Sequence, residues 1–230
     1  MPRIIKKPSA NHDVRRRALH HAHQHVVRYI KTLSMLRLIS FEFIGTPIKE
    51  SALIVANHPS LLDFIILMHD FPNAICLYKS QTRDNPILSD FVNIAGYIEG
   101  MDGTRSASKR IINECCERLG EGHHIALFPE GTRSKSNIDV ARFRATAFHA
   151  ALKSGVGIQP VAIYCEPLFL GKNQPWSTFS KARNRMVVEY MEPIQSDELP
   201  IAMQNARSLA DLARDQIAAK LLLLHKKDHS

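Results

Sequence analysis

Residues 57–63 read Asn57-His58-Pro59-Ser60-Leu61-Leu62-Asp63, and they lie between two apolar segments. The preceding segment, residues 52–56, is short and contains β-branched side chains, which is typical of a buried strand. The following segment, residues 64–68, is also apolar, and Pro59 suits the first position of a helix, where its missing N–H would have no intrahelical partner. The sequence therefore predicts a strand, a tight junction and a helix that begins at Pro59.

This junction places a histidine at the helix start and a carboxylate about one turn further on, so that Asp63 can reach back to His58. A neutral histidine can remove the proton of a hydroxyl group, and a buried aspartate on its other ring nitrogen fixes the tautomer and stabilises the imidazolium. Ser60 is not expected to be a nucleophile, because residues two apart at a helix start do not face each other. The alternative is structural: His58 caps the helix, and Asp63 is an acid favoured by the helix dipole.

A second motif follows another apolar segment, Ile125-Ala126-Leu127-Phe128, which is predicted to be a buried strand. It reads Pro129-Glu130-Gly131-Thr132-Arg133-Ser134. Gly131 permits a tight turn with exposed backbone N–H groups. The guanidinium of Arg133 can grip a phosphate or a carboxylate. Together these residues indicate an anion-binding turn.

In this order and at this distance, the motifs of residues 57–63 and 128–134 resemble those of the glycerolipid acyltransferase family, whose best-known members acylate lysophosphatidic acid. The resemblance covers roughly residues 40 to 195. It implies that His58 is the general base and that Asp63 is its partner. It also implies an acceptor-binding block that consists of Glu130, Gly131, Thr132 and Arg133.

Three further positions match the family's pattern. Lys79 follows the strand-like residues 74–77 and matches a lysine often found before the second block. Gly96 matches the glycine of that block. Pro160, within the apolar residues 157–163, matches the last block, which helps to wall the acyl site.

The second block then departs from the family's pattern. The family usually follows this glycine with an aromatic residue, an aliphatic residue and an arginine thought to contact the acceptor phosphate. Here the sequence continues Tyr97-Ile98-Glu99-Gly100-Met101-Asp102-Gly103, and the next arginine is Arg105. Either Arg105 substitutes for the missing arginine, or Arg133 holds the acceptor with little help, or the acceptor carries no glycerol phosphate.

The length of 230 residues and the hydrophobic content of 45% suit one domain with a substantial core. Four cysteines show no metal-ligand spacing, and we interpret them as reduced thiols in a cytosolic setting: Cys76, Cys115, Cys116 and Cys165. Further elements are expected as a helix over 106–119 capped by Ser106 or Ser108, a helix over 140–152, strands over 158–164 and 186–190, and a helical region after Ser196.

Charge is concentrated at the N-terminus. Residues 1–37 hold nine Lys and Arg side chains and one acid, Asp13, which accounts for the whole net charge of +8. A basic arm on a neutral domain suggests attraction to an anionic surface. The arm is not a signal peptide, because charged residues and histidines interrupt any apolar region. We predict a basic arm with an amphipathic helix over residues 1–39 and an acyltransferase domain over residues 40–230.

Residues 26–39 carry apolar side chains at helical spacing: Val26, Val27, Ile30, Leu33, Leu36 and, at the end of the series, Leu38. Basic residues lie between them, so this helix can lie in a membrane interface. The alternative is an amphipathic helix packed on the domain. We expect interfacial contact, and with it a peripheral location at the inner face of the membrane. No segment approaches the length of a membrane span.

The arm also holds five histidines: His12, His20, His21, His23 and His25. They have no acidic or cysteine companions at ligand spacing apart from Asp13, so we expect a solvated polar surface and no metal site. A protein that binds nucleic acid or membrane without catalysis would explain the arm but neither motif, and the domain shows no aromatic and basic platform for bases.

The sequence thus predicts one α/β domain, with a central mixed sheet flanked by helices and an N-terminal helical extension. The predicted activity is transfer of a fatty acyl group from acyl-CoA or acyl-carrier protein to the hydroxyl group of a lysophospholipid such as 1-acyl-glycerol-3-phosphate. The alternative is the same chemistry on a lipid without glycerol phosphate, such as a lyso-aminolipid or a specialised hydroxylated lipid. We predict a membrane surface as a partner, no cofactor and no nucleic acid.

Overall fold

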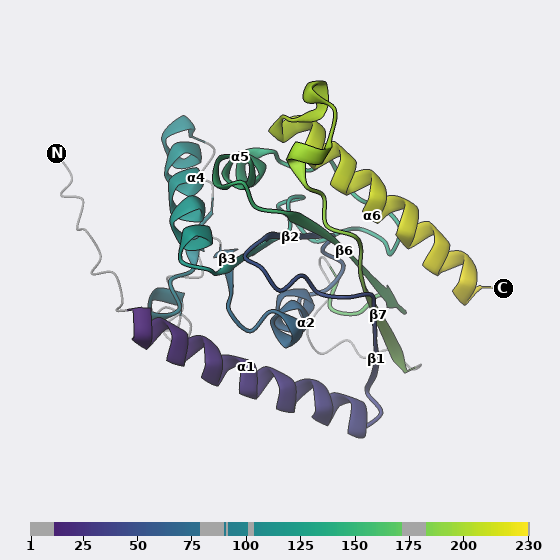
Figure 1. Cartoon of the computed structure of the whole chain (residues 1–230). Helices are drawn as coiled ribbons and strands as arrows, with labels where there is room; N and C mark the ends of the chain where they lie inside the picture. Colours follow the sequence, from purple (N-terminus) through teal and green to yellow (C-terminus); the bar gives the residue numbers. More distant parts are fainter. Residues whose placement is uncertain (1–11, 79–89, 91, 101–103, 172–182, 230) are drawn as a thin grey trace.

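A computed structural model describes residues 12–78, 90, 92–100, 104–171 and 183–229 (Figure 1). In chain order, its helices and strands are α1 (His12–Met35), β1 (Ile39–Ile44), β2 (Leu53–Ala56), α2 (Asp63–Asp70), β3 (Ala74–Tyr78), β4 (Ile98–Glu99), α4 (Arg105–Gly120), β5 (His124–Leu127), α5 (Thr146–Ser154), β6 (Ile158–Glu166), β7 (Asn184–Tyr190), two short 3₁₀ helices (Ser196–Glu198 and Ile201–Met203) and α6 (Ala206–Asp228).

The strands form one sheet in the order β1-β7-β6-β2-β5-β3-β4. Strands β2 to β6 pair in parallel, whereas β7 runs antiparallel to β6, and β1 runs parallel to β7. The sheet is therefore mixed, and helices flank it on both sides (Figure 1). This confirms the predicted fold class, including the helix at the N-terminal end.

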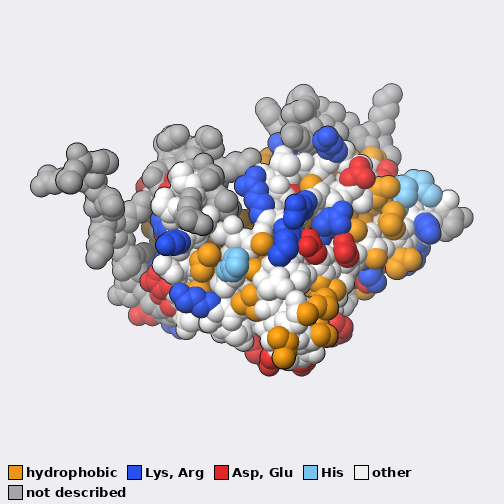
Figure 2. All heavy atoms as spheres, turned by 90° about the horizontal axis from the view of Figure 1, so that it is seen from above, with side chains coloured by type: hydrophobic (Ala, Val, Ile, Leu, Met, Phe, Trp, Pro, Cys, Tyr) orange, Lys and Arg blue, Asp and Glu red, His pale blue; other side chains and the backbone are white. Residues whose placement is uncertain are grey.

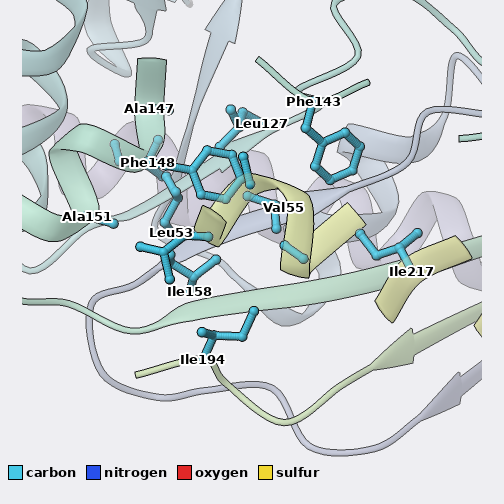
Figure 3. Packing of buried hydrophobic residues seen from close by; sticks show 14 of the residues in the cluster. Leu53, Val55, Leu127, Phe143, Ala147, Phe148, Ala151, Ile158, Ile194 and Ile217 are labelled. Carbon is cyan, nitrogen blue, oxygen red and sulfur yellow. The ribbon is translucent and has the colours of Figure 1, made fainter. Parts of the chain in front are cut away.

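The two faces of the sheet are covered by different helices: α1 and α2 lie on one side, and α4, α5 and α6 lie on the other (Figure 1). Along β2 the side chains alternate between the two cores. Leu53 and Val55 pack with Phe148 of α5 and Ile217 of α6 (Figure 3), whereas Ile54 belongs to the core under α2. Because both faces are buried, the central strands read as continuous apolar segments.

The predicted strands all form, but several helix ends differ from the prediction. Helix α2 begins at Asp63 and not at Pro59, because the Asp63 carboxylate accepts a hydrogen bond from the Ser60 N–H (2.8 Å), which holds the intervening residues in a turn. Helix α5 begins at Thr146 and not near residue 140. Thr104, not a serine, caps α4.

Helix α1 is longer than predicted toward the N-terminus and ends at Met35. Its apolar side chains Leu19, Val26 and Ile30 are buried, and Val26 and Ile30 pack with Met68 of α2. For these side chains the helix is packed on the domain. Ile39 begins a strand within the sheet, so the predicted boundary at residues 39 and 40 lies at the start of β1. No helix among the described residues has the length and apolar character that crossing a bilayer requires.

The turn between α1 and β1 nevertheless leaves large apolar side chains exposed. Met35 is 77% exposed, and Leu36 and Leu38 are also exposed. Because β1 runs against the direction of β2, this turn lies at the sheet edge where β2 ends. The exposed side chains and the 57–63 motif therefore share one edge of the molecule.

Arg15 ties α1 to the opposite end of the sheet. Its side chain is only 2% exposed and pairs with Glu121 at 2.5 Å. Gly96 lies directly against it: a Cβ added at Gly96 would lie 2.5 Å from Nε of Arg15, and Gly96 has a φ of +71°. The glycine of the family's second block therefore makes room for a buried arginine.

We expect Gly96→Ala to reduce the free energy of unfolding more than Gly122→Ala does. Both glycines have positive φ, but nothing lies within 4 Å of an added Cβ at Gly122. Gly122→Ala should therefore cost about 1–2 kcal/mol for the left-handed backbone alone. Gly96→Ala should cost a further 1–3 kcal/mol or so, the usual price of overpacking. Urea unfolding of both variants measures this, and equal losses would contradict the packing of Arg15 on Gly96.

Candidate active site

Both sequence motifs emerge at the same edge of the sheet. β2 and β5 are parallel neighbours, with Val55 opposite Leu127, so the residues that follow them lie side by side. The helices that come next leave in opposite directions, because α2 covers one face of the sheet and α5 covers the other (Figure 1). In open α/β sheets, ligands bind in the crevice that such a divergence leaves at the carboxyl ends of the strands.

His58 and Asp63 form a hydrogen-bonded pair at this end of the sheet, where the topology predicts the crevice. Nδ1 of His58 lies 2.8 Å from Oδ2 of Asp63. The imidazole stacks on Phe128 with ring centroids 4.2 Å apart and an interplanar angle of 16°. The His58 side chain is 22% exposed, whereas Asp63 is fully buried. Among the described residues none hydrogen-bonds to Nε2 of His58, so this nitrogen is available to a ligand.

The carboxylate of Asp63 has an unusual environment. Burial raises its pKa from 3.8 to about 6, and the hydrogen bond with His58 opposes that shift. Its Oδ1 atom is buried without a hydrogen-bond partner among the described residues, while Oδ2 accepts from both His58 and the Ser60 N–H. A carboxylate in this position holds the imidazole with its proton on Nδ1 and its lone pair on Nε2.

Asn57 fixes the strand end from which His58 projects. Its buried amide donates to the Ile163 carbonyl oxygen and accepts from the Ile163 N–H, both at 2.8 Å. This pair of bonds continues the pairing of β2 with β6 beyond Ala56. The sequence motif contained Asn57, but its role depends on a residue more than a hundred positions away.

Glu130 joins the two motifs. Its Oε1 accepts from the His58 N–H (3.0 Å) and from the Ser134 hydroxyl (2.9 Å), and its Oε2 accepts from the Ala141 N–H (3.0 Å). The Ser134 N–H in turn donates to the His58 carbonyl oxygen at 2.6 Å. The acceptor-binding role implied for Glu130 stays a prediction. The structure shows that its buried carboxylate bonds the backbone of both loops.

The rest of the second motif forms the expected turn. Gly131 has a φ of +71°, and the guanidinium of Arg144 lies against it, 2.9 Å from where a Cβ would stand. One nitrogen of Arg133 donates to the carbonyl oxygens of Leu170 and Gly171 at 2.8 and 2.9 Å. Arg133 is therefore anchored at one side, and its position is fixed beside the turn.

A cavity of about 380 Å³ opens beside this turn. Its walls are Glu130, Thr132, Arg133, Ser134, Lys135, Ile138, Asp139, Val140, Ala141, and Arg214 and Ala218 of α6. No sequence pattern indicated the contribution of α6, because Arg214 lies far from the motifs along the chain.

The other residues that the sequence singled out are Lys79, Pro160 and Arg105. Lys79 lies outside the described residues. Pro160 lies inside β6, buried opposite Val55, so a place in the acyl site stays a prediction. Arg105 is the first residue of α4, and its side chain is also outside the description.

Two nucleophilic side chains near the pair are unsuited to covalent catalysis. Ser60 is fully buried, and its hydroxyl accepts a hydrogen bond from the Leu62 N–H. Cys165 is fully buried as well, and burial raises the pKa of its thiol to about 12. The arrangement can therefore supply a base for an incoming hydroxyl group, whereas neither of these side chains is placed to form an acyl-enzyme.

Comparison with known proteins points to acyl transfer as the activity. The family model described as Acyltransferase matches residues 21–164. A 1-acyl-sn-glycerol-3-phosphate acyltransferase from Borreliella burgdorferi is 28% identical over 180 residues, which cover 76% of this chain and 68% of that protein. One from Helicobacter pylori is 28% identical over 173 residues, 72% of each chain.

A relative with a different named acceptor is also similar. A lyso-ornithine lipid O-acyltransferase from Pseudomonas aeruginosa is 29% identical over 193 residues, which cover 78% of this chain and 70% of that protein. In fold, the chain is similar to the crystal structure of the 1-acyl-sn-glycerophosphate acyltransferase PlsC from Thermotoga maritima, with a TM-score of 0.71 and 20% identity over 88% of this chain and 79% of that one.

The match to the family model covers more than half of the chain, and both motifs lie where the sheet brings them together. The chain therefore belongs to the acyltransferase family, and it is an acyltransferase.

Proposed function

We propose that this acyltransferase moves a fatty acyl group from a thioester donor, acyl-CoA or acyl-carrier protein, to the hydroxyl group of a lysophospholipid such as 1-acyl-glycerol-3-phosphate. The observation that carries the proposal is the His58–Asp63 pair, with Nε2 open at the crevice and the Arg133 turn beside it. A base next to a cation suits an alcohol that carries a negatively charged group.

In the proposed reaction, Nε2 of His58 removes the proton of the acceptor hydroxyl as its oxygen attacks the thioester carbonyl carbon. The new C–O bond forms, the C–S bond breaks, and the imidazolium returns its proton to the departing thiolate. Asp63 stabilises the imidazolium through Nδ1. Because the thioester is already activated, the acyl group passes directly to the acceptor, which agrees with the burial of Ser60 and Cys165.

Within the predicted acceptor block, the residues take different parts. Glu130 is assigned a positioning role. Its carboxylate accepts a hydrogen bond from the His58 N–H, so it acts through His58. Gly131 and Thr132 shape the turn. Arg133 keeps guanidinium nitrogens free of the Leu170 and Gly171 carbonyl oxygens, and these are proposed to contact the acceptor's anionic group.

A second acceptor class has support of its own. The second block lacks the arginine thought to contact the acceptor phosphate, and one similar protein is named for a lyso-ornithine lipid. We therefore keep a lyso-aminolipid as the alternative acceptor, with the same base and the same donor.

The exposed apolar turn supports contact with a membrane from which this lipid is delivered. We propose that the contact is with the inner face of that membrane. Met35, Leu36 and Leu38 lie at the edge of the sheet that also carries His58, and Leu61 within the motif is 57% exposed. The basic side chains Arg28 and Lys31 are exposed on the same helix. An apolar rim beside cations suits an anionic bilayer surface.

We expect His58→Ala to lower kcat by roughly 10²–10⁴-fold, the usual contribution of a general base. His69→Ala is the matched control. His69 also pairs with an aspartate (Asp70, 2.8 Å) and stacks on a phenylalanine (Phe43, ring centroids 4.7 Å apart), but it lies outside the 57–63 motif. Acceptor-dependent release of thiol from a long-chain acyl thioester measures both variants. Equal rates in wild type and His58→Ala would contradict the mechanism.

A pH profile tests the role of Asp63. Its pKa is raised to about 6, so the carboxylate is ionised above that pH and becomes protonated below it. We expect kcat of the wild type to fall as the pH drops through about 6, because a protonated Asp63 no longer stabilises the imidazolium.

Asp63→Asn should be nearly inactive throughout this range without loss of stability. An Asp pKa that is raised on folding means that ionisation lowers stability as the pH rises from below 3.8 to above about 6, and Asn removes that cost. Urea unfolding at pH 7.5 should therefore give Asp63→Asn a free energy of unfolding at least equal to that of wild type. A large loss of stability would indicate that Asp63 is mainly structural.

Two acceptors distinguish the proposed substrate classes. With lysophosphatidic acid as acceptor, Arg133→Ala should raise the acceptor KM at least tenfold and leave the donor KM within twofold, because the lost contact is to the acceptor phosphate. With lyso-ornithine lipid as acceptor, wild-type turnover faster than with lysophosphatidic acid would favour the alternative. If Arg133→Ala changed the acceptor KM and the donor KM equally, that result would indicate that this arginine is structural.

A further inference from the structure

The cavity beside the second motif is separate from the His58–Asp63 pair but shares a wall with it. Neither His58 nor Asp63 lines the cavity. Glu130 and Ser134 do line it, and they bond the His58 N–H and the His58 carbonyl oxygen. A ligand in the cavity would therefore lie against the backbone that carries the base.

Cations face this cavity from two directions along the chain. Lys135 is exposed in the loop and has no hydrogen-bond or ion-pair partner among the described residues. Arg214 reaches in from α6 and is held by hydrogen bonds to the Val140 carbonyl oxygen (3.2 Å) and to Asp215 (2.8 Å). Of the acids in the wall, Glu130 has both oxygens occupied by hydrogen-bond donors, and Asp139 is exposed.

Further basic side chains extend the positive surface. Arg142 and Arg144 are exposed next to Ala141, which lines the cavity. Arg207 of α6 contributes less to this surface, because its charge is paired with Asp211. On the face that carries α4, α5 and α6, Lys and Arg side chains gather around a few acids (Figure 2). A phosphate group is the ligand that such a cavity would recognise.

The position of the cavity suggests which substrate carries that phosphate. The exposed apolar side chains Met35 and Leu61 lie at the end of the sheet that carries His58, whereas α6 contributes a wall of the cavity. A lipid acceptor that stays in a bilayer approaches from the apolar rim. A water-soluble thioester donor approaches from the opposite side, where a cationic surface faces solvent.

We propose that Lys135 and Arg214 bind the phosphate of the donor's phosphopantetheine arm in this cavity. The arm is common to acyl-CoA and acyl-carrier protein, and it carries the thioester at the end opposite its phosphate. The inference rests on the proposed acyl transfer and adds a donor site to it. Arg133 also lines the cavity, and its remaining guanidinium nitrogens are assigned to the acceptor.

Kinetics of the double variant Lys135→Gln/Arg214→Gln test this site. We expect the KM for the acyl-CoA donor and for the acyl-carrier-protein donor to rise at least tenfold, with the acceptor KM within twofold of wild type. Lys153→Gln is the matched control. Lys153 is an exposed cation on α5 that bonds Asn113 and lies outside the cavity wall. The Lys153→Gln variant should therefore have the donor KM of the wild type. Thermal unfolding of all three proteins checks that the variants are folded.

Binding without turnover gives an independent measurement. In His58→Ala, calorimetric titration with 4′-phosphopantetheine should show binding at least tenfold tighter than titration with pantetheine, and the double variant should abolish that difference. Equal binding of the two compounds, an increase confined to the acceptor KM, or an effect confined to acyl-CoA would each overturn the assignment.

These outcomes also separate the two proposals. If wild type transfers acyl groups but the double variant keeps its donor KM, the cavity assignment fails and the proposed function stands. If wild type transfers acyl groups to neither lysophosphatidic acid nor lyso-ornithine lipid, the proposed function fails, whatever the titrations show.

Discussion

The site depends on the hydrogen bonds by which the buried Glu130 holds the backbone N–H groups of His58 and Ala141. The loops after β2 and β5 turn toward opposite faces of the sheet, and no strand pairing connects them beyond Val55 and Leu127 in the described part of the chain. Glu130 supplies that connection with one buried carboxylate, and the Ser134 N–H adds a backbone hydrogen bond to the His58 carbonyl oxygen. A buried charge is stable only when donors surround it, so both loops must be in place together.

Sequence patterns predicted the strands, but they misplaced the starts of two helices. Strands with both faces buried leave long apolar segments, so β2, β5, β6 and β7 could be predicted from composition alone. The helix start predicted at Pro59 was wrong because Asp63 bonds back to Ser60. The start of α5 was misplaced because the N–H groups of Ala141 and Arg144 are bonded to the second motif.

Some contacts of the candidate site could be predicted from the sequence, and others could not. The His58–Asp63 pair could be predicted because both residues lie within one short motif, whose spacing fixes their approach. The bond of Glu130 to His58, the bonds of Asn57 to Ile163 and the cavity wall at Arg214 could not, since each joins segments that only the folded sheet brings together. Sequence patterns report local geometry well, and they report contacts across the sheet only after the strand order is known.

The burial of Arg15 alters how the basic N-terminal region can be studied. This arginine counts toward the net charge of residues 1–37, yet it is enclosed between α1, Gly96 and Glu121 and is not available to an external surface. A truncation that removes the first seventeen residues would delete charge and a structural brace at once. Electrostatic attraction and domain integrity can therefore be separated only by neutralising exposed cations such as Arg16 and Arg17 singly, with the helix left complete.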